Sequence, residues 1–318
     1  MAQQQPDEDR RDLMFGAKKF KEVAEEYITM HKRDLRPTSY ASYLHLLKKR
    51  ILPVLGEIRV TKITNETIQE FVNISQENGY SKHGTRDCVS IVKLVLKYGA
   101  KKGYCKESVM EVKYAREDRK KKQSFLNNEE YTKLFRFCIE HPGKRTLPTL
   151  ISMTTGIRIG EVCALKYGDI DFDKATINIE RSVKRVSIPS KKSFIEISDP
   201  KTVSSIRVVP ILPEVLKAVE STRLADDVYI SSGDNKLPLE PRSYRQKYGR
   251  LLKSLDIAPH TFHDLRHTFA SRCINAGSDA RTVADILGHA NVEMTLNTYT
   301  HSTDERRRAV AANACVLV

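Results

Sequence analysis

The sequence lacks the patterns by which proteins commonly hold a metal ion or a nucleotide. Its six cysteines form no C-x-x-C pair and show no Cys/His ligand spacing, so we expect reduced thiols, mostly in the core. No glycine-rich phosphate loop and no carboxylate cluster suited to Mg²⁺ appears among its 318 residues. The sequence therefore predicts chemistry that uses neither a bound metal nor a cofactor.

Long apolar stretches are missing as well. No run approaches the roughly 18 to 20 apolar residues that a membrane-spanning helix needs. The first residues, M-A-Q-Q-Q-P-D-E-D-R-R-D, are polar and contain no signal-peptide core. We therefore expect a soluble, cytoplasmic protein with no membrane partner.

Positive charge is what the sequence has in excess. It holds 54 Lys and Arg against 40 Asp and Glu, a formal net charge of +14, and its pI is near 9.4. Such an excess favours a polyanionic partner, most often DNA or RNA. A protein that is merely basic is the alternative, and the charge alone leaves it open.

Helical signals fill the first part of the chain. After a polar N-terminus (1–14), which is predicted to be disordered, apolar residues recur at helical spacing from Phe15 to about Cys105. The caps and breakers divide this region into separate helices. Four helices are expected. The first covers 20–28, and the second begins after Pro37, with Thr38 or Ser39 as the cap, and ends just before Pro53. The third begins near Asn65, and the fourth extends from Ser81 to Gly103.

A row of cations, spaced i, i+7, i+11 and i+15 from Arg86, occupies one face of the fourth helix, opposite its apolar side. A solvated face on a core helix is the alternative. Because the row has no carboxylate partners at i, i+4, we prefer contact with a phosphate backbone.

A basic stretch without apolar residues, R-E-D-R-K-K-K-Q (116–123), follows. Its composition fits an exposed linker and its charge fits one that lies along DNA. We place the domain boundary here, between a helical domain (15–115) and a second domain (124–318). The residues expected to contact DNA are Thr38, Ser39, Lys82, Arg86, Lys93, Lys97 and Lys101 in the first domain and Arg119, Lys120, Lys121 and Lys122 in the linker.

The second domain mixes helix and strand signals. Short, alternating, β-branched segments between 175 and 211 predict a small antiparallel sheet. The rest is mostly helical, so the expected fold class is mostly α with a small antiparallel β-sheet, an α+β domain. The best-marked helices are one capped at Asn127 or Asn128, one around 147–154, and one from a cap at Ser278 or Asp279 to Gly288.

Six polar side chains of this domain suit a reaction on a phosphodiester. The pentacoordinate transition state carries about two negative charges, which Arg, Lys, His or backbone N–H groups must balance when no metal is present. An arginine fork contacts two phosphate oxygens at once, and a phenol can attack the phosphorus. The six are Arg158, Lys201 (in a polar turn between two predicted strands), His263 and Arg266 (spaced i, i+3 on one helix face), His289 and Tyr299.

The contexts of these residues closely resemble the tyrosine recombinase (phage integrase) family. The carrying stretches are T-T-G-I-R-I-G-E around Arg158, T-F-H-D-L-R-H-T-F around His263, and L-G-H-A followed by T-L-N-T-Y-T-H. The resemblance extends from Phe15 to the C-terminus, although the N-terminal helices match in type only. It implies a helical core-binding domain and a tyrosine-recombinase catalytic domain that form a C-shaped clamp on double-stranded DNA.

The resemblance also implies a role for each residue. Tyr299 is the nucleophile, which forms a 3′-phosphotyrosyl link and frees a 5′-hydroxyl. Arg158 and Arg266 bind the non-bridging phosphate oxygens, and Lys201 protonates the departing 5′-oxygen. The remaining implied roles are proton transfer with the nucleophile by His263, a hydrogen bond to the phosphate by His289, and support of the first arginine by Glu161. His267 is expected to face elsewhere and to be structural.

The family resemblance leaves several activities open. The main prediction is a site-specific recombinase that integrates and excises a mobile element through a Holliday junction, because 180–200 extends the sheet beyond the compact Xer-like pattern. The alternatives are a dimer-resolving recombinase of the Xer type, a type IB topoisomerase and a non-catalytic DNA-binding relative. Mobile-element integrases often carry an arm-site DNA-binding domain first; here the helical domain is entered by about residue 15, so that module is not in the sequence.

Assembly follows from the chemistry. One Tyr299 cuts one strand and recombination of two duplexes needs four cuts, so we expect a tetramer on DNA at the nucleoid of a bacterial cytosol, and a monomer when free. The tail (302–318) turns from charged to apolar and packs either on its own domain or on a neighbour's. An accessory directionality factor would be compatible with this scheme.

Overall fold

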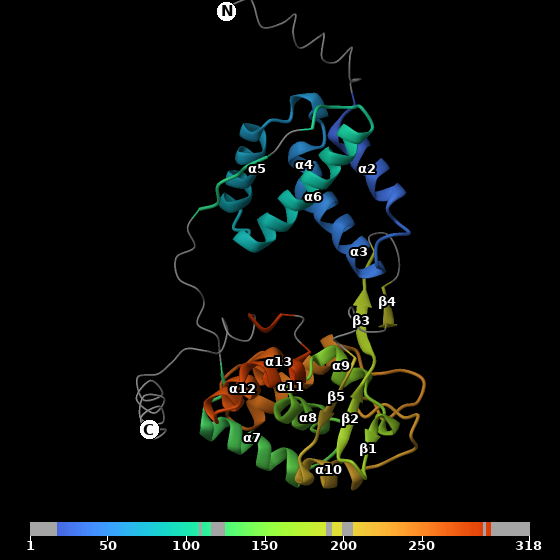
Figure 1. Cartoon of the computed structure of the whole chain (residues 1–318), viewed down its shortest axis with the longest axis vertical. Coiled ribbons are helices and arrows are strands. Elements are labelled where there is room, and N and C mark those ends of the chain that lie inside the picture. Colours follow the sequence, from blue (N-terminus) through green and yellow to red (C-terminus); the bar gives the residue numbers. More distant parts are fainter. Residues whose placement is uncertain are drawn as a thin grey trace, which may run out of the picture. The chain divides into compact units, whose positions relative to one another are not determined.

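A computed structural model of the chain describes residues 18–107, 110–115, 125–188, 193–198, 206–288 and 291–293. Helices α2–α6 belong to one compact unit and helices α7–α13 to a second (Figure 1). The predictions for the N-terminus (1–14), the linker (116–123) and the tail (302–318) fall outside the described residues. The C-shaped clamp concerns the arrangement of the two units and stays a prediction. No described helix combines the length and apolar character that crossing a membrane requires.

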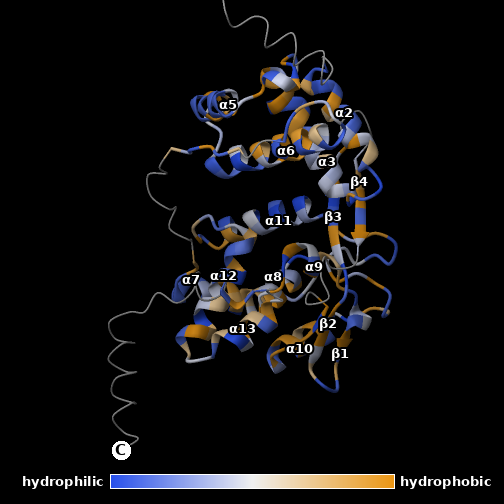
Figure 2. Cartoon of the chain, turned by 45° about the horizontal axis from the view of Figure 1, so that its top comes forward, coloured by the Kyte–Doolittle hydropathy of each residue, from blue (hydrophilic) through white to orange (hydrophobic). Residues whose placement is uncertain are grey.

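The first unit is a helical bundle around one apolar core. Phe20, Val23, Phe71, Val92 and Val95 are each at most 1% exposed within it. Helices α2, α5 and α6 are amphipathic, with apolar residues on one side and polar residues on the other (Figure 2). They are α2 (Phe20–Met30), α3 (Pro37–Leu46), α4 (Leu52–Leu55), α5 (Asn65–Glu77) and α6 (Lys82–Lys101), with a 3₁₀ turn at Val60–Lys62.

The second predicted helix differs from the structure at both ends. Its N-cap is Arg36 and not Thr38 or Ser39, and Pro37 is the first helical residue. The first position suits proline because its φ is already helical and its missing N–H is not needed there. The helical path also passes Pro53, through a π-helical turn at Leu47–Ile51 that leads into α4. The wider turn shifts the carbonyls with which a proline ring in a regular helix would clash.

The second unit combines helices with two small sheets, so the mostly helical fold with antiparallel strands is confirmed. Strand β2 (Thr176–Ile179) lies between β1 (Ile170–Asp171) and β5 (Arg207–Pro210), antiparallel to both. Strands β3 (Ser182–Val186) and β4 (Phe194–Ser198) pair separately, so the one predicted sheet is two. The helices are α7 (Asn128–Glu140), α8 (Leu147–Thr155), α9 (Ile159–Ala164), α10 (Pro213–Glu220), α11 (Pro241–Ser254), α12 (Phe262–Asn275) and α13 (Ala280–Leu287).

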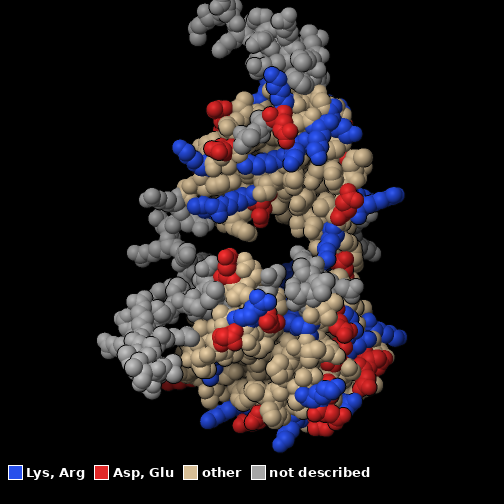
Figure 3. All heavy atoms as spheres, viewed as in Figure 1, with Lys and Arg blue, Asp and Glu red and all other residues tan. Residues whose placement is uncertain are grey.

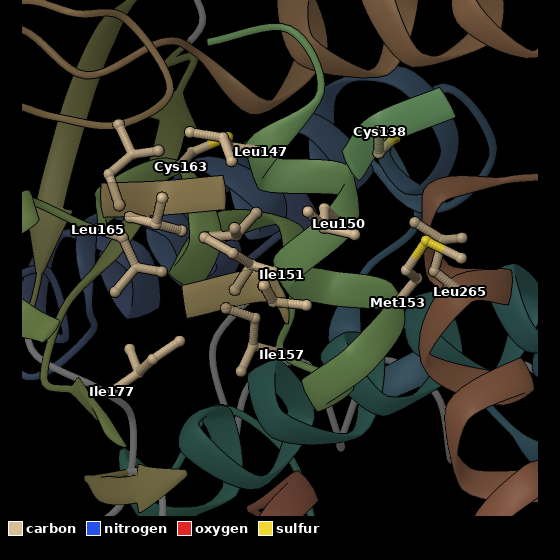
Figure 4. Packing of buried hydrophobic residues seen from close by; sticks show 14 of the residues in the cluster. Cys138, Leu147, Leu150, Ile151, Met153, Ile157, Cys163, Leu165, Ile177 and Leu265 are labelled. Carbon is tan, nitrogen blue, oxygen red and sulfur yellow. The ribbon is translucent and has the colours of Figure 1, made fainter. Parts of the chain in front are cut away.

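Helix α8 is the centre of this unit, and every one of its residues is buried. A helix that is buried on all sides has to be enclosed by other elements, and α8 is in contact with α7, α9, α10 and α12. Its side chains Leu150, Ile151 and Met153 lie in the core together with Ile177 of β2 and Leu265 of α12 (Figure 4). The end of α8 is therefore held firmly, and the first predicted arginine follows it directly.

The cysteines of the described part are free, and four of the five are buried. Burial raises the pKa of Cys138 and of Cys163 to about 12, so both thiols stay protonated near neutral pH. This agrees with the sequence prediction of reduced core cysteines.

Candidate active site

The turn after α8 requires glycine. Gly156 has φ 69°, in the left-handed region, and a Cβ at this position would lie 2.5 Å from Leu287 Cδ2 and 2.6 Å from Phe269 Cδ1. The carbonyl of Gly156 accepts a hydrogen bond of 2.9 Å from Nη1 of Arg266. This close packing connects the end of α8 to α12 and α13. It therefore helps to position Arg158, which follows the turn, and Arg266, which bonds to it.

Arg158 caps the N-terminus of α9, where Glu161 holds it at two points. The backbone N–H of Arg158 donates to Oε2 of Glu161 (3.0 Å), and its Nη1 donates to Oε1 (2.9 Å). The guanidinium also donates from Nη1 to the carbonyl of Leu287 (3.4 Å) and from Nη2 to that of Gly288 (3.1 Å). Since its side chain is still 38% exposed, the arginine is anchored but open to a ligand.

A second arginine, which the sequence analysis missed, binds the same carboxylate. Nη2 of Arg207 donates to Oε2 of Glu161 (2.9 Å), and its Nε donates to the carbonyl of Ile286 (2.7 Å). The side chains of this pair are only 7% and 5% exposed. A signal existed in the strand pattern, because Arg207 shares a face with the buried Val209 two residues on.

The charge of Glu161 is settled by these two neighbours. Burial by itself would raise the pKa of the carboxyl, but the guanidiniums of Arg207 and Arg158 outweigh it and lower the pKa below its usual value. The carboxylate is therefore ionised at neutral pH. Two arginines around one carboxylate leave the cluster with net positive charge, which suits an anionic ligand.

Arg158 meets His263 and Arg266 at one cavity of about 360 Å³. Both residues come from the start of α12, which opens with a hydrogen bond from the Thr261 N–H to Asp264 (2.7 Å). Arg266 is 2% exposed, whereas His263 is exposed to solvent. Three of the six predicted side chains are thus brought together.

The prediction that His267 faces away from the site is wrong. Its ring lies 4.6 Å from that of His263 between centroids, edge to face at 84°. The reason is the spacing, because residues four apart lie on one helix face. Although His263 is partly exposed, burial of its ring, followed by the positive charges of His267, Arg266 and Arg158, lowers its pKa to about 4. His263 is therefore neutral at physiological pH and able to accept a proton.

Three more polar residues that the sequence analysis did not single out line the cavity: Arg245, Tyr248 and His260. Arg245 is an exposed residue of α11, and Nε2 of His260 lies 3.3 Å from Glu130 Oε2. The hydroxyl of Tyr248 is buried without a hydrogen-bond partner among the described residues, and burial raises its pKa. No cluster of three or more His, Cys, Asp or Glu in the described ranges is arranged to hold a metal.

Lys201, His289 and Tyr299 fall outside the described residues, as do Arg119, Lys120, Lys121 and Lys122. Their roles stay predictions.

The predicted DNA-contact residues of the first unit divide into three groups. Thr38 and Ser39 are half-buried in the first turn of α3, while Lys97 and Lys101 of α6 are exposed. Lys and Arg side chains form bands on the viewed face of this unit (Figure 3). The other three cations contact the chain's own segment 110–115. These contacts are a hydrogen bond from Lys82 to the carbonyl of Ala115 (3.1 Å), the Arg86 guanidinium over the ring of Tyr114 (5.2 Å) and a hydrogen bond from Lys93 to the carbonyl of Met110.

Comparison with known proteins agrees with this geometry. The chain is 24% identical to the ICEBs1 integrase of Bacillus subtilis (strain 168) over 298 residues, 90% of this chain and 79% of that protein. It is 27% identical to the tyrosine recombinase XerC of Bacillus licheniformis over 305 residues, 93% of this chain and 95% of that protein. With the transposase of transposon Tn916 from Enterococcus faecalis it shares 35% identity over 171 residues, 48% of this chain but only 41% of that protein.

Solved structures show the same fold at low identity. The Tn1549 transposon integrase in complex with transposon right end DNA matches with a TM-score of 0.76 at 22% identity, over 94% of this chain and 100% of that chain. A lambda integrase tetramer bound to a Holliday junction matches with a TM-score of 0.65 at 17% identity, over 95% of this chain and 83% of that one.

Two family models match the chain directly. Residues 19–75 match the N-terminal SAM-like domain of phage integrases, and residues 124–306 match the phage integrase family itself. The second match covers more than half of the chain and contains Arg158, His263 and Arg266 in their shared cavity. The protein belongs to the phage integrase family.

Proposed function

We propose that the protein is a site-specific DNA recombinase that cuts and rejoins DNA through a 3′-phosphotyrosyl intermediate. One observation carries the proposal. Arg158 and Arg266, far apart in the sequence, converge with a neutral His263 on one cavity, where net positive charge can hold a phosphodiester. Donors that are fixed before the reaction stabilise a transition state without reorganising.

The described residues take distinct parts in the proposed step. Arg158 and Arg266 bind the non-bridging oxygens and balance the charge that grows on them. The effect of Arg266 is strengthened because it lies in a protein interior, where water screens charges less. His263 accepts the proton of the nucleophile, since its lowered pKa leaves a ring nitrogen free. Bond formation to phosphorus and bond cleavage then leave the number of phosphoesters unchanged.

The residues outside the described part complete the proposal. The oxygen of Tyr299 attacks the phosphorus and the bond to the 5′-oxygen breaks, with Lys201 giving its proton to that oxygen and His289 bonding the phosphate. Because the phosphotyrosine keeps the energy of the broken bond, the 5′-hydroxyl of a partner strand can reverse the step. Rejoining then needs neither ATP nor a metal.

The partners and the biological role belong to the same proposal. Relatives named as integrase or transposase of mobile elements favour integration and excision through a Holliday junction, by a tetramer on double-stranded DNA. We place this activity in the bacterial cytosol at the nucleoid, with an accessory directionality factor as an optional further partner. The nearly full-length similarity to XerC favours dimer resolution as the second candidate. Recombination of two identical chromosomal sites, without activity on element ends, would select that candidate.

The test is to trap the covalent intermediate. On a nicked suicide substrate, in buffer with EDTA, the wild type should form a protein–DNA adduct that resists SDS and is removed by protease. Tyr299→Phe should form no adduct while it still binds DNA. Tyr248→Phe is the matched control, because Tyr248 lines the cavity yet its buried hydroxyl is a poor nucleophile. An adduct from Tyr299→Phe, or its loss only in Tyr248→Phe, would refute the assignment.

A further inference from the structure

A second cleft, of about 740 Å³, lies in the catalytic unit between the α7–α8 connection and the C-terminal half of α11. No Asp or Glu is among the residues that line it. The basic side chains that line it are His141, Lys144, Arg145, Lys247 and Arg250. We propose that this basic cleft binds a DNA backbone phosphate other than the one that reacts. The inference rests on the proposed function, which supplies DNA as the ligand.

The walls of the basic cleft are held by buried hydrogen bonds. The hydroxyl of Tyr244, a fully buried residue of α11, donates to the carbonyl of Arg145 (2.8 Å) and lies 2.9 Å from Oγ1 of Thr149 in α8. In the connection itself, the Thr146 hydroxyl donates to the carbonyl of His141 (2.6 Å). The cations on the two sides of the cleft are therefore brought together by the fold and not by chance exposure.

The charges of the basic cleft are unbalanced within the protein. In the part of the chain that the structure describes, Lys144, Arg145, Lys247 and Arg250 form no ion pair with a carboxylate. Lys247 is half-buried, and burial, together with the charges of Lys144 and Arg145, lowers its pKa. Like charges held this close destabilise the free protein. Phosphate oxygens in the cleft would relieve the repulsion and accept hydrogen bonds from the same groups.

Helix α11 connects the basic cleft to the catalytic cavity. Arg245 lines the cavity, whereas Lys247 and Arg250 line the cleft. Residues two apart on a helix do not share a face, so Arg245 and Lys247 project from different sides of α11. A phosphate in the cleft is therefore not a direct neighbour of the reacting phosphate on the same strand and belongs to a more distant part of the duplex. Contacts of this kind position the DNA without reading its sequence.

The experiment compares two variants that each remove two positive charges from the net +14. Lys144→Gln with Lys247→Gln empties the cleft of two cations. Lys133→Gln with Lys217→Gln is the control, because both lysines are exposed and lie outside the cleft. Duplex binding is followed by fluorescence anisotropy between low and physiological salt, and circular dichroism verifies that each variant is folded. For the cleft variant the slope of log K against log salt should decrease by about 0.9, the value for one phosphate contact, on unrelated sequences alike.

Each other outcome overturns the proposal. A slope equal to that of the wild type would mean that DNA does not enter the cleft, and an equal decrease in the control would mean a general effect of charge. Inorganic phosphate tests the other source of the same chemistry. If it raises the melting temperature of the wild type but not of the cleft variant while the DNA slope is unchanged, the cleft is a site for free phosphate. Failure of the proposed function would appear separately, as a wild type that binds DNA but never forms the adduct.

Discussion

At the scale of single residues, the two arginines on Glu161 differ in what they leave open. Arg158 is 38% exposed at its side chain and faces the cavity, whereas Arg207 is 7% exposed and ends on the carbonyl of Ile286. Arg158 can therefore bind a phosphate, whereas Arg207 holds the Glu161 carboxylate that positions Arg158. We therefore expect the loss of Arg207 to lower the free energy of unfolding.

Arg207→Met should lower the free energy of unfolding by about 3 kcal/mol, because a buried carboxylate loses one of its two cations. The control is Arg223→Met, which breaks an exposed pair with Asp226 (side chains 43% and 68% exposed) and should cost at most about 1 kcal/mol. Urea unfolding at pH 7 measures both. Equal losses in the two variants would mean that the burial of the Glu161 pair carries no extra energy.

The pH dependence of the same variant has a definite sign. The pKa of Glu161 is lower in the folded protein than its usual value of 4.5. Its contribution to stability is therefore present above that value and is lost as the pH falls through the folded pKa. The wild type should lose more stability than Arg207→Met between pH 6 and pH 3, and a parallel decline of both would contradict this.

His263 sets a second pH dependence, this time of the reaction. With a pKa of about 4, it stays neutral far below the usual histidine value of about 6.5. Single-turnover cleavage of the suicide substrate should therefore keep its rate as the pH falls from 7 to about 5. Two results together would contradict the low pKa of His263. They are a wild-type cleavage rate that is already halved near pH 6.5 and a rate in His263→Gln that does not change with pH.

The residues found and missed by sequence follow a physical rule. His263 and Arg266 could be placed together because three residues along a helix return to the same face, a purely local relation. The same relation should have placed His267 beside His263, and the prediction that it faces elsewhere was wrong. Arg245 and His260 reach the site through contacts between distant segments, which local patterns do not contain. For Arg207 the strand pattern indicates a buried face but not its partner Glu161.

At the scale of elements, the turn from α8 to α9 carries the site. Gly156→Ala should lower the free energy of unfolding by about 3 kcal/mol, since it combines left-handed strain with overlap on Leu287 and Phe269. Gly143→Ala is the control, as a Cβ there would meet nothing within 4 Å, and its effect should stay within about 0.5 kcal/mol. Urea unfolding compares them. If both variants are equally stable, the packing at Gly156 is looser than described.

Helix ends were predictable where a side chain defines them. Asn127 and Asp279 cap α7 and α13 through hydrogen bonds to their own first turns, and Gly288 ends α13 in the left-handed region, all local chemistry. The sequence predicts that the second helix ends before Pro53, but the chain continues through a π-helical turn at Leu47–Ile51 into α4. Propensity alone cannot foresee this, because burial of Ile51 and Leu55 in the core favours the longer helical path.

At the scale of the whole molecule, the described hydrophobic core of the first unit shares no residue with the clusters of the second unit. We expect the two units to fold independently, with the predicted linker (116–123) as the segment between them. Limited trypsin digestion without DNA should cut first near Arg119–Lys122 and leave two folded fragments. If that segment is the most protected in the free protein, or if either fragment unfolds on release, the boundary is misplaced.

The fold class was predictable because the sequence pattern of each unit indicates its elements. Amphipathic helices precede the linker, and short alternating strands after it are confined to 175–211. The split into two sheets was not, since the pairing partners of a strand are chosen by contacts that alternation does not encode. The charge excess predicts a polyanionic partner but does not indicate where the cations gather in the fold. The basic cleft, built from two segments far apart in sequence, appears only in the folded chain.

The cluster around Glu161 has a consequence for how such sequences can vary. Glu161 binds Arg158 and Arg207, and a Cβ at Gly288 would come within 3.1 Å of the Arg207 guanidinium. Replacement of any one member leaves a charge with fewer partners or a side chain without room. Among related sequences, positions 158, 161, 207 and 288 should therefore persist or change together, and evolution should find few paths that alter them one at a time.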